Sequence, residues 1–563
     1  MSFAVAIFLG AFLIFQVQPF LGKYILPWFG GTPSVWSTCM LFFQTLLLGG
    51  YLYAHIVATR LTRRTQALVH SAVLIGALGI LGYQWLAWGA PVLPAEAFKP
   101  QDSNDPTWRL LWLLIGSVGV PYFVLSSTGP LVQSWFNKVE PTKSPYRLYT
   151  LSNIGSLLAL VSYPFAIEPL LKLQYQAQLW AVLYVLFATS MVWIAIRLVR
   201  HGTATSKEPA QQALEDPVPP PGWLDRLLWL GFASAASAML LAATNQICQE
   251  VAVIPFLWIA PLTLYLLSFI IVFAGDRWYS RRFWGITFLV ATTVSCLALF
   301  DTFTLPITGQ VAVFCGLLFS LCMVCHGEMV RLRPHPHYLT SFYLMMSAGG
   351  ALGGAFVSLV APLLFVGFWE LHISLWVAWA LFLVVIWRTD SSWINQPGIA
   401  ALKKGLVGML ALLAGVLYWQ TRYANDEALY CERSFYGVLR VRNMGWWTED
   451  GKAYKLSHGA IVHGFQYIAP ERRHEPVSYY GPQSGIALAL TEFPKWLEEN
   501  GRKRPLRVGV IGLGVGTLVT FAAEGDYYRF YEINPSVVAL SQGPDAYFTY
   551  LRDAVATVDI IDG

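Results

Sequence analysis

The chain has 563 residues, of which 56% are hydrophobic and only 12% charged, and its net charge is +5. Soluble globular proteins carry about 25% charged residues, so this composition excludes an ordinary soluble protein. The positive charge is spread over short loops and forms no basic stripe, which argues against nucleic acid as a partner. Because apolar residues are concentrated before about residue 421, we predict a large membrane domain followed by a small soluble one.

Thirteen hydrophobic segments in the first 420 residues are long enough to cross the ~30 Å hydrocarbon core of a bilayer. They lie near residues 3–27, 34–58, 67–89, 107–136, 147–170, 174–198, 224–248, 254–274, 283–300, 306–330, 338–363, 368–388 and 402–420. The polar stretch between the sixth and seventh segments cannot bury a core and predicts a flexible tether. We therefore expect a polytopic α-helical bundle of twelve or thirteen spans: a first half (1–200), a linker (201–222) and a second half with one extra span (223–421).

A weak internal repeat relates the two halves. Trp36 opens the second segment and Trp258 lies in the eighth, and a basic loop follows each of them, Arg60–Arg64 and Gly275–Arg282. The second loop reads G-D-R-x-x-x-R-R, which resembles the loop between the second and third helices in each half of major facilitator transporters. The resemblance implies two parallel six-helix halves. The alternative is a cytoplasmic loop that simply collects arginine.

Loops rich in Lys and Arg alternate with loops that are poor in them. The basic clusters are Arg60/Arg63/Arg64, Lys138/Lys143/Arg147, Arg197/Arg200, Arg277/Arg281/Arg282, Arg331/Arg333 and Lys403/Lys404. The positive-inside rule then predicts a multi-pass protein of the cell (inner) membrane with a cytoplasmic N-terminus. A genuine thirteenth span would place the soluble part outside the cytoplasm, whereas an interfacial 402–420 segment would return it to the cytoplasm.

Polar residues inside the spans are the candidate solute pathway. They are Gln16, Gln18, Lys23, Gln44, Asn153, Asn245, Gln246, His326 and Glu328. Such groups face a bundle interior or a water-filled cavity, so they indicate either transport or structural hydrogen bonding. Lys23 can also reach the membrane interface.

The tenth segment ends in Cys322-Met323-Val324-Cys325-His326-Gly327-Glu328. C-x-x-C-H is the haem c attachment string, but here it lies in an apolar helix near its expected cytoplasmic end. We therefore expect helix packing, with no haem and no metal. His326 and Glu328 point to different faces of the helix. They form either a gate or proton-linked site, or a surface pairing of Glu328 with Arg331 or Arg333. The next segment carries Gly349–Gly354, whose spacing predicts close helix packing.

The soluble tail begins with alternating apolar and polar residues that predict a small β-sheet (422–483). An α/β region (484–563) follows, with a helix over Ser484–Glu498, a strand over Arg507–Ile511, a glycine loop, a helix over Thr517–Glu524 and a strand over Tyr528–Ile533. Glycines let a backbone approach a nucleotide, and an acid at the second strand's tip accepts ribose hydroxyls. The candidate cofactor-binding residues are therefore Gly512, Gly514, Gly516 and Glu532; a tight turn without a ligand is the alternative. Thr517 replaces the third glycine of a dinucleotide fingerprint, which favours S-adenosylmethionine-type ligands over NAD.

The strings ERSFYGVLRV, LSHGAIVHGFQ, SYYG, VGVIGLGVGTL and YEINP resemble polyamine aminopropyltransferases, the spermidine synthase family. FQVQPFLGKYILPWFGG, CHGE and LTSFYLMMSAGGALGG look like the subgroup in which a transporter-like bundle precedes that domain. The resemblance implies a Rossmann-like domain that binds decarboxylated S-adenosylmethionine or a related nucleoside. It also implies a polyamine or other small cationic solute as partner, with Gln466 and Tyr479 or Tyr480 on the substrate side.

Three departures from that family matter. Val515 stands where the family loop carries an aspartate that contacts the donor, and His458 stands where an aspartate commonly precedes the glycine. The family's catalytic aspartate follows a fourth strand, whereas the sequence as given reaches only Asp562-Gly563, at the third. We therefore expect a truncated α/β domain that is either a fragment of a longer protein or a domain that no longer catalyses, and no catalytic residue is assigned. We expect a membrane-anchored spermidine synthase-like protein that is inactive as this chain stands. The alternative is a transporter-like protein whose tail senses a nucleoside or polyamine without catalysis.

Overall fold

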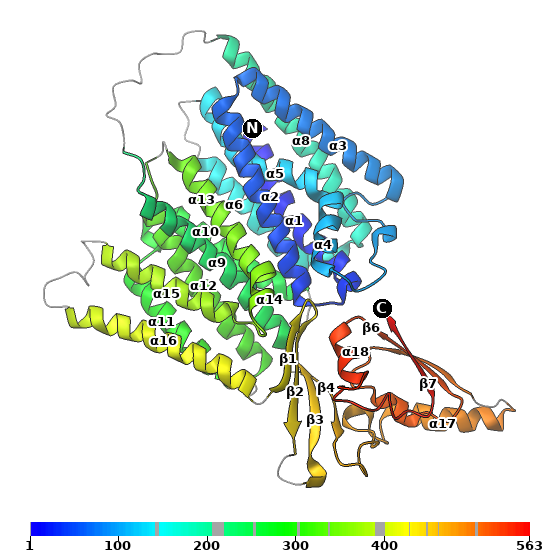
Figure 1. Cartoon of the computed structure of the whole chain (residues 1–563). Helices are drawn as coiled ribbons and strands as arrows, with labels where there is room; N and C mark the ends of the chain where they lie inside the picture. Colours follow the sequence, from blue (N-terminus) through cyan, green and yellow to red (C-terminus); the bar gives the residue numbers. More distant parts are fainter. Residues whose placement is uncertain are drawn as a thin grey trace.

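The computed structural model describes residues 2–140, 146–204, 219–250, 255–300, 305–335, 338–388, 400–426, 428–445, 449–459, 461–501 and 505–563. It contains a bundle of long helices and a β-rich tail domain that docks on one end of the bundle (Figure 1). Most of the expected tether lies outside the described residues.

The first half of the bundle contributes six spans. They are α1 (Ser2–Ile25), α2 (Pro33–Arg60), α3 (Arg63–Trp88), the run α4–η3–α5 (Pro106–Leu114, Ile115–Gly119, Val120–Val139), the run α6–η4–α7 (Tyr146–Ser162, Tyr163–Ile167, Glu168–Leu170) and α8 (Leu173–Ala204). The turns between spans follow from local chemistry. Thr62 caps α3 by accepting a hydrogen bond from the Thr65 N–H at 3.3 Å, and Gly89 ends that helix in the left-handed conformation that glycine tolerates.

The second half contributes six more spans. They are α9 (Trp223–Glu250), α10 (Pro255–Ala274), α11 (Arg281–Phe300), α12 (Ile307–Arg331), the run α13–η8–α14 (Leu339–Ala355, Phe356–Val360, Ala361–Leu364) and α15 (Glu370–Arg388). Among the described residues, twelve helices are long and apolar enough to cross a membrane. The six-plus-six division predicted from the sequence is confirmed.

The thirteenth hydrophobic segment also forms a helix, α16 (Ala400–Asp426), which packs against α11 and α15. It is not among the twelve candidate spans found by length and hydropathy in the described residues, so the prediction of twelve or thirteen spans stands at twelve with this additional helix beside them. Helix α16 runs beside α15 and leads into the tail domain (Figure 1).

The internal repeat is stronger in the structure than in the sequence. The fifth and eleventh spans share one layout: a 17-residue α-helix, a five-residue π-helical segment, and a short helix with proline at its second position. Helices α2 and α10 both begin with proline and carry tryptophan three residues later. Helix α9 packs on α13 as α1 packs on α6. The two halves are therefore structural copies of each other.

Small residues set the helix spacing, as Gly349–Gly354 predicted. A methyl group on Gly349 would lie 2.5 Å from the Leu230 carbonyl oxygen, and one on Gly353 would lie 2.5 Å from that of Ser234. Only glycine permits this approach of α13 to α9.

The tail contains two sheets. The first is antiparallel, with strands β1 (Ala428–Ser434), β2 (Gly437–Met444), β3 (Ala453–His458) and β4 (Ile461–Tyr467) in sequence order. The second is parallel, with strands β5 (Arg507–Ile511), β6 (Tyr527–Glu532) and β7 (Thr557–Asp562), also in sequence order. Helix α17 (Gly485–Glu499) precedes β5, and α18 (Pro535–Ser541) connects β6 toward β7. The predicted small sheet is confirmed, and three parallel strands form the second region.

One helix prediction is wrong. After the glycine loop the chain forms only a five-residue 3₁₀-helix, η12 (Thr517–Phe521), instead of an α-helix over Thr517–Glu524. The reason lies in Asp526, whose carboxylate accepts from the N–H groups of Ala523 at 2.9 Å and Leu506 at 2.8 Å. These bonds turn the chain early and bring β6 beside β5.

The two sheets of the tail share one core. Leu439, Val441 and Leu456 of the antiparallel sheet pack with Tyr528 and Phe530 of β6. The tail is therefore held together as a single unit, because neither sheet covers its apolar face alone.

Candidate functional site

A cavity of about 280 Å³ lies between the two halves of the bundle. Its aromatic walls are Phe15, Phe43, Tyr265, Phe269 and Tyr343, and its polar groups include Gln18, Gln44, Tyr122, Ser126, Asn153 and Ser347. Every lining stretch lies in the middle of its helix or in the half nearer the basic loops. None of the described residues that line the cavity is Asp, Glu, Lys, Arg or His. The cavity is thus amphipathic and uncharged.

Gln18 of α1 belongs to the polar part of the cavity wall. Its side-chain amide donates to the Tyr122 hydroxyl at 3.1 Å. The buried Gln18 Oε1 accepts no hydrogen bond from the described residues. Among the described residues that line the cavity, Gln44 Oε1 and Ser347 Oγ are likewise buried without a hydrogen-bond partner. The cavity wall thus offers acceptors for a donor brought by a ligand.

Gln44 of α2 joins the two halves at the same depth. Its amide donates to the Ser237 hydroxyl of α9 at 2.9 Å, and that hydroxyl donates to the Gly350 carbonyl of α13 at 2.9 Å. Since Ser237 has one proton and gives it to Gly350, it must accept from Gln44. The predicted residues Gln18, Gln44 and Asn153 are therefore brought together at one cavity.

The other predicted polar residues of the spans lie elsewhere. Asn245 of α9 accepts from the Ser37 hydroxyl of α2 at 2.9 Å, a second hydrogen bond between the halves. Gln16 is buried away from the cavity, and Gln246 is half-buried outside it. Lys23, at the end of α1, forms an ion pair with Glu168 of α7. None of these four residues lines the cavity, and Asn245 and Lys23 connect neighbouring helices.

The two tryptophans of the repeat meet across the two halves at one end of the bundle. Trp36 of α2 and Trp258 of α10 stack with ring centroids 4.8 Å apart and planes 16° apart, and both are fully buried. Gly22 of α1 packs on the pair; a methyl group there would lie 3.2 Å from Trp258 and 3.5 Å from Trp36. Because one ring comes from each half, separating the halves at this end would break the stack. We call this end, where the tail docks, the closed end.

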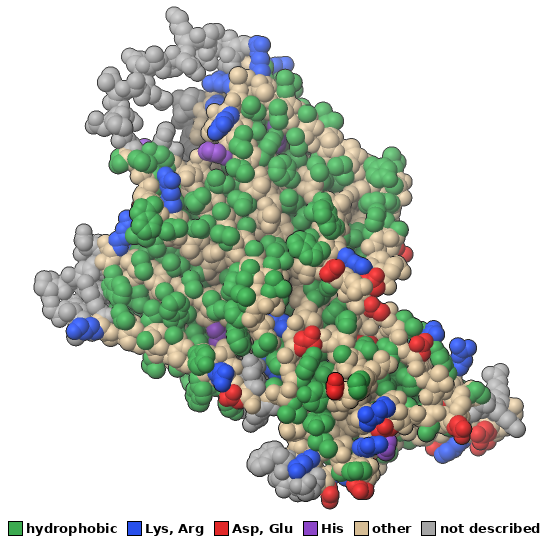
Figure 2. All heavy atoms as spheres, in the orientation of Figure 1, with side chains coloured by type: hydrophobic (Ala, Val, Ile, Leu, Met, Phe, Trp, Pro, Cys, Tyr) green, Lys and Arg blue, Asp and Glu red, His purple; other side chains and the backbone are tan. Residues whose placement is uncertain are grey.

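The opposite end of the bundle carries the basic loops. Figure 2 shows Lys and Arg side chains at that end, whereas acidic side chains, together with further Lys and Arg, lie on and beside the tail. The cavity extends from mid-bundle toward this basic end.

Glu328 and His326 take different partners, as their spacing indicated, but Glu328 does not pair with Arg331 or Arg333. It accepts from Arg281 at 2.7 and 2.6 Å and from the Tyr279 hydroxyl at 2.7 Å. Arg281 begins α11, so the G-D-R-x-x-x-R-R loop is tied to the end of α12. Arg281 is the favoured partner because its Nε and Nη2 each donate to a different oxygen of the carboxylate, which makes the pair bidentate.

His326 is fully buried in the second half. Its Nδ1 lies 2.8 Å from the Ser268 hydroxyl, and its ring stacks on Phe269 with centroids 3.6 Å apart. Phe269 in turn lines the cavity. His326 therefore does not line the cavity itself but packs against Phe269, which does.

The glycine loop of the tail has the backbone that its pattern predicts. Gly512, Gly514 and Gly516 have φ angles of 85°, 56° and 84°, a region that side-chain-bearing residues avoid. The Glu532 carboxylate, however, accepts from the Leu513 N–H at 2.9 Å and the Asn534 N–H at 2.8 Å. Val515 is buried against Gly464 of β4. The loop and its acid are thus bonded to each other and packed on the antiparallel sheet.

The predicted substrate-side residues also have protein partners. The Gln466 amide donates to the Arg473 carbonyl at 2.9 Å and the Thr549 hydroxyl at 3.1 Å, and its oxygen accepts from the Thr549 N–H at 2.7 Å. The Tyr479 hydroxyl donates to the His463 carbonyl at 3.3 Å, and the Tyr479 and Tyr480 rings are in tilted contact, with centroids 4.5 Å and planes 59° apart. Gln466 therefore ties β4 to the segment before β7.

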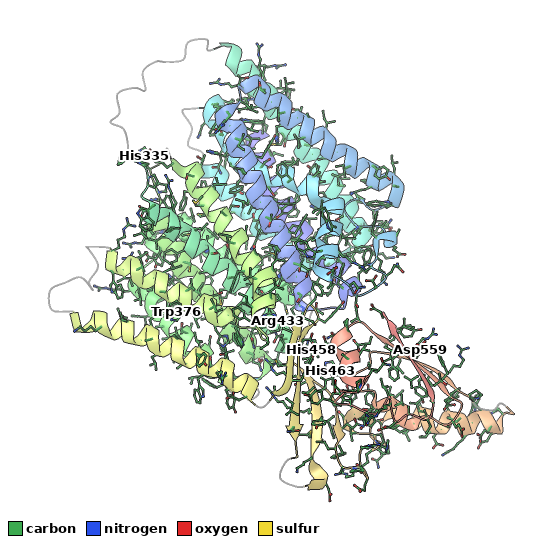
Figure 3. All side chains as sticks on the ribbon, viewed as in Figure 1. His335, Trp376, Arg433, His458, His463 and Asp559 are labelled. Carbon is green, nitrogen blue, oxygen red and sulfur yellow. The ribbon has the colours of Figure 1, made fainter. Side chains whose placement is uncertain are left out.

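Two histidines lie together where the tail faces the bundle (Figure 3). The rings of His458 and His463 are 5.6 Å apart. Burial lowers the pKa of His458 from 6.5 to about 4, and burial also lowers the pKa of His463. Both rings are therefore neutral at pH 7.

Sequence reasoning missed the residues that join tail and bundle. Arg433 of β1 pairs with Glu370 of α15 through two bonds of 3.0 Å, and both side chains are buried. In the sequence, Glu370 is a lone acid at the start of an apolar helix, and Arg433 is an arginine beside a tight turn. Neither is specific, because the two residues are 63 positions apart.

Comparisons with known proteins give fold-level likenesses only. No family model and no curated protein matches the chain. Among solved structures, a D-xylose-proton symporter matches with 13% identity and a TM-score of 0.41, covering 71% of this chain and 98% of that one. The inward-open xylose transporter XylE from E. coli matches with 11% identity and a TM-score of 0.42 over 71% and 98%. A bacterial homolog of the human lysosomal transporter Spinster, inward-facing and occupied, matches with 16% identity and a TM-score of 0.39 over 75% and 94%. Likenesses at this level define no family and no solute for this chain.

Proposed function

We propose that the membrane part is a solute transporter of the major-facilitator type. The observation that carries this proposal is the cavity between two repeat-related halves, sealed at one end by the Trp36–Trp258 stack. Alternating access by rocking of two such halves requires a central site and a seal that one half can leave. The state described is closed on the tail side.

The solute that fits this cavity is an uncharged amphipathic molecule. A cation such as spermidine would need an acidic partner, and a buried charge without one is costly. The aromatic walls suit an apolar body, and the free Gln18 oxygen suits a hydroxyl or amide donor. This reading replaces the polyamine that the family resemblance implied.

The sidedness follows from the basic loops. The positive-inside rule assigns the end with Arg60, Arg197 and Arg331 to the cytoplasm. The N-terminus is then cytoplasmic. Helix α15 ends at the same basic end, where Arg388 pairs with Asp225, and α16 leads from there to the tail at the opposite end. In this proposal α16 is a further crossing after the twelfth span, and the tail lies on the outer face of the membrane. A cytosolic nucleoside donor would not reach a tail on that side, which counts against aminopropyl transfer.

The tail is proposed to be a non-catalytic relative of the spermidine synthase-type domain that senses a nucleoside or a polyamine. Three parallel strands, three left-handed glycines and Glu532 support an ancestral nucleoside site. The bonds already made by Glu532 and Gln466, with Val515 in the loop, support loss of catalysis.

Transport in proteoliposomes tests the main proposal. Neutral hydroxylated or amide solutes that raise the melting temperature of the purified protein would be tested for counterflow, with spermidine as the cationic comparison. We expect saturable counterflow of a neutral solute, a loss of about tenfold in Gln18→Leu from the missing hydrogen bonds, and little change in Gln16→Leu. Saturable spermidine uptake that Gln18→Leu abolishes would overturn the solute class. Equal loss in both variants would overturn the site.

Calorimetry of the full chain tests the tail. We expect heat of binding from methylthioadenosine or spermidine, reduced in Glu532→Ala. If neither compound binds, sensing is refuted and the tail is purely structural.

A further inference from the structure

The tail domain touches both halves of the bundle at the closed end. On the first-half side, Phe435 meets Phe29 with ring centroids 6.4 Å apart, and Tyr436 packs against Gly30. Asp562, at the end of β7, accepts from the backbone N–H of Ser103 at 2.9 Å and from its hydroxyl at 2.8 Å. On the second-half side, Arg433 reaches α15. The turn between β1 and β2 is therefore in contact with both halves.

The two attachments differ in strength. The Arg433–Glu370 pair is bidentate, with side chains only 4% and 0% exposed, and Arg433 also donates to the Gly367 carbonyl at 2.7 Å. Removing either partner of a buried ion pair with this geometry strongly destabilises the folded protein. The Ser103–Asp562 bonds, by contrast, are exposed to solvent, where such contacts are worth little. Figure 3 shows Arg433 at the junction between bundle and tail.

Rocking of the halves would pull these attachments apart. Trp36 and Trp258 lie in α2 and α10, next to the segments that the tail contacts, so the tail spans the seam that the stack closes. From this geometry we propose that the tail is a brace that holds the closed end shut. It stays attached to the second half through Arg433, and it releases Ser103, Gly30 and Phe29 of the first half when that end opens. This inference rests on the proposed transport function, because it is alternating access that requires the seam to open.

The labelling of native cysteines can report both the opening of the closed end and the detachment of the tail from the second half, and it needs no solute. Cys39 lies one turn from Trp36 and is fully buried, and Cys248 is buried with its thiol beside the Trp258 indole. Opening of the closed end would expose both to a thiol reagent. Cys431 of β1 lies 3.6 Å from the Val366 carbonyl, at the second-half attachment.

The experiment is timed N-ethylmaleimide labelling of the full-length protein, read by peptide mass spectrometry. Tyr436→Phe removes the bond that the Tyr436 hydroxyl donates to the Ser103 carbonyl at 3.4 Å, and Asp562→Asn replaces a carboxylate acceptor by a weaker amide oxygen. In the double variant we expect Cys39 and Cys248 to label roughly three- to tenfold faster, the factor set by about one lost hydrogen bond. Cys431 should label at the wild-type rate in that variant and faster in Arg433→Gln. Asp559→Asn is the matched control, because Asp559 is on the same strand but bonds only within the tail to Tyr527 and Arg529.

Three outcomes overturn the brace. The first is that the labelling rates of Cys39 and Cys248 stay unchanged both in Asp562→Asn/Tyr436→Phe and in Arg433→Gln. The second is that Asp559→Asn raises these two rates as much as Asp562→Asn/Tyr436→Phe does. The third is that Cys431 labels faster in Asp562→Asn/Tyr436→Phe. The first shows that the closed end opens independently of the tail, the second that tail unfolding explains the rise, and the third that the tail leaves the second half. Cys322 and Cys325, buried in α12, should label at wild-type rates throughout. If labelling follows the expected pattern but no solute is transported, the transport proposal fails and the brace stands.

Discussion

Substitution of Glu328, whose carboxylate is buried, tests most directly which contacts hold α11 and α12 together at the basic end of the bundle. The carboxylate is 0% exposed and receives three hydrogen bonds, two from Arg281 and one from Tyr279. Glu328→Gln keeps the shape and the tyrosine bond but leaves the guanidinium of Arg281 without its counter-charge. Removing one partner of a buried pair costs about 3–5 kcal/mol, so we expect a loss of that order in the free energy of unfolding.

The assay is reversible unfolding by SDS in mixed micelles, with a double-mutant cycle. Arg281→Met alone should cost about as much as Glu328→Gln, because it leaves an unpaired carboxylate. The double variant should cost less than the two together, with a coupling of about 2 kcal/mol or more. Arg331→Gln, at the neighbouring exposed arginine, should change stability by less than about 0.5 kcal/mol.

Two results would refute this reasoning. Either Glu328→Gln matches Arg331→Gln in stability, or the double-mutant cycle is additive. In either case the arginine of the G-D-R-x-x-x-R-R loop would not be the partner that holds α12.

Three further predictions concern packing, the glycine loop and pH. Gly349→Ala should destabilise the bundle by about 1–3 kcal/mol, because the methyl group meets the Leu230 carbonyl, whereas Gly350→Ala, with open space around it, should not; equal melting temperatures would contradict this. Val515→Asp places a carboxylate in the buried core of the tail, so limited proteolysis should cut the tail faster; an undisturbed tail that gains nucleoside binding would contradict it. His458 has a pKa lowered to about 4 from 6.5, so the unfolded tail binds a proton that the folded tail does not. His458 should leave tail stability unchanged above about pH 6.5 and lower it by up to about 1.4 kcal/mol per pH unit down to about pH 4. In urea titrations followed by tail fluorescence, His458→Gln should remove this contribution and leave that of His463, whose pKa is also lowered; an unchanged slope would contradict this.

The contact between the tail and the bundle accounts for a buried charge in each of them, Glu370 and Arg433. Glu370 is a fully buried acid at the start of a membrane helix, which is costly unless it is paired. Its partner Arg433 comes from the tail, which also satisfies the Gly367 carbonyl beside it. Docking of the tail is therefore part of how α15 is stabilised, and a role at the closed end follows from the same contact.

By itself the sequence determined the membrane class, the six-plus-six division, the basic end and the order of sheet, helix and parallel strands in the tail. These are set by local properties: hydrophobic length, charge between spans, and alternation along strands. It also marked Gln18, Gln44 and Asn153, since polar groups in apolar spans must face an interior.

Only the tertiary structure decided which polar residues line the cavity and which merely join helices. Gln16 and Gln18 look equivalent along the chain, yet only Gln18 reaches the cavity, because that depends on how α1 is rotated among its neighbours. The same holds for Glu328, whose partner is Arg281 and not the nearer Arg331, and for Arg433, whose partner is 63 residues away. Pairings between distant charges depend on where the fold brings the helix ends, and local spacing carries no information about that.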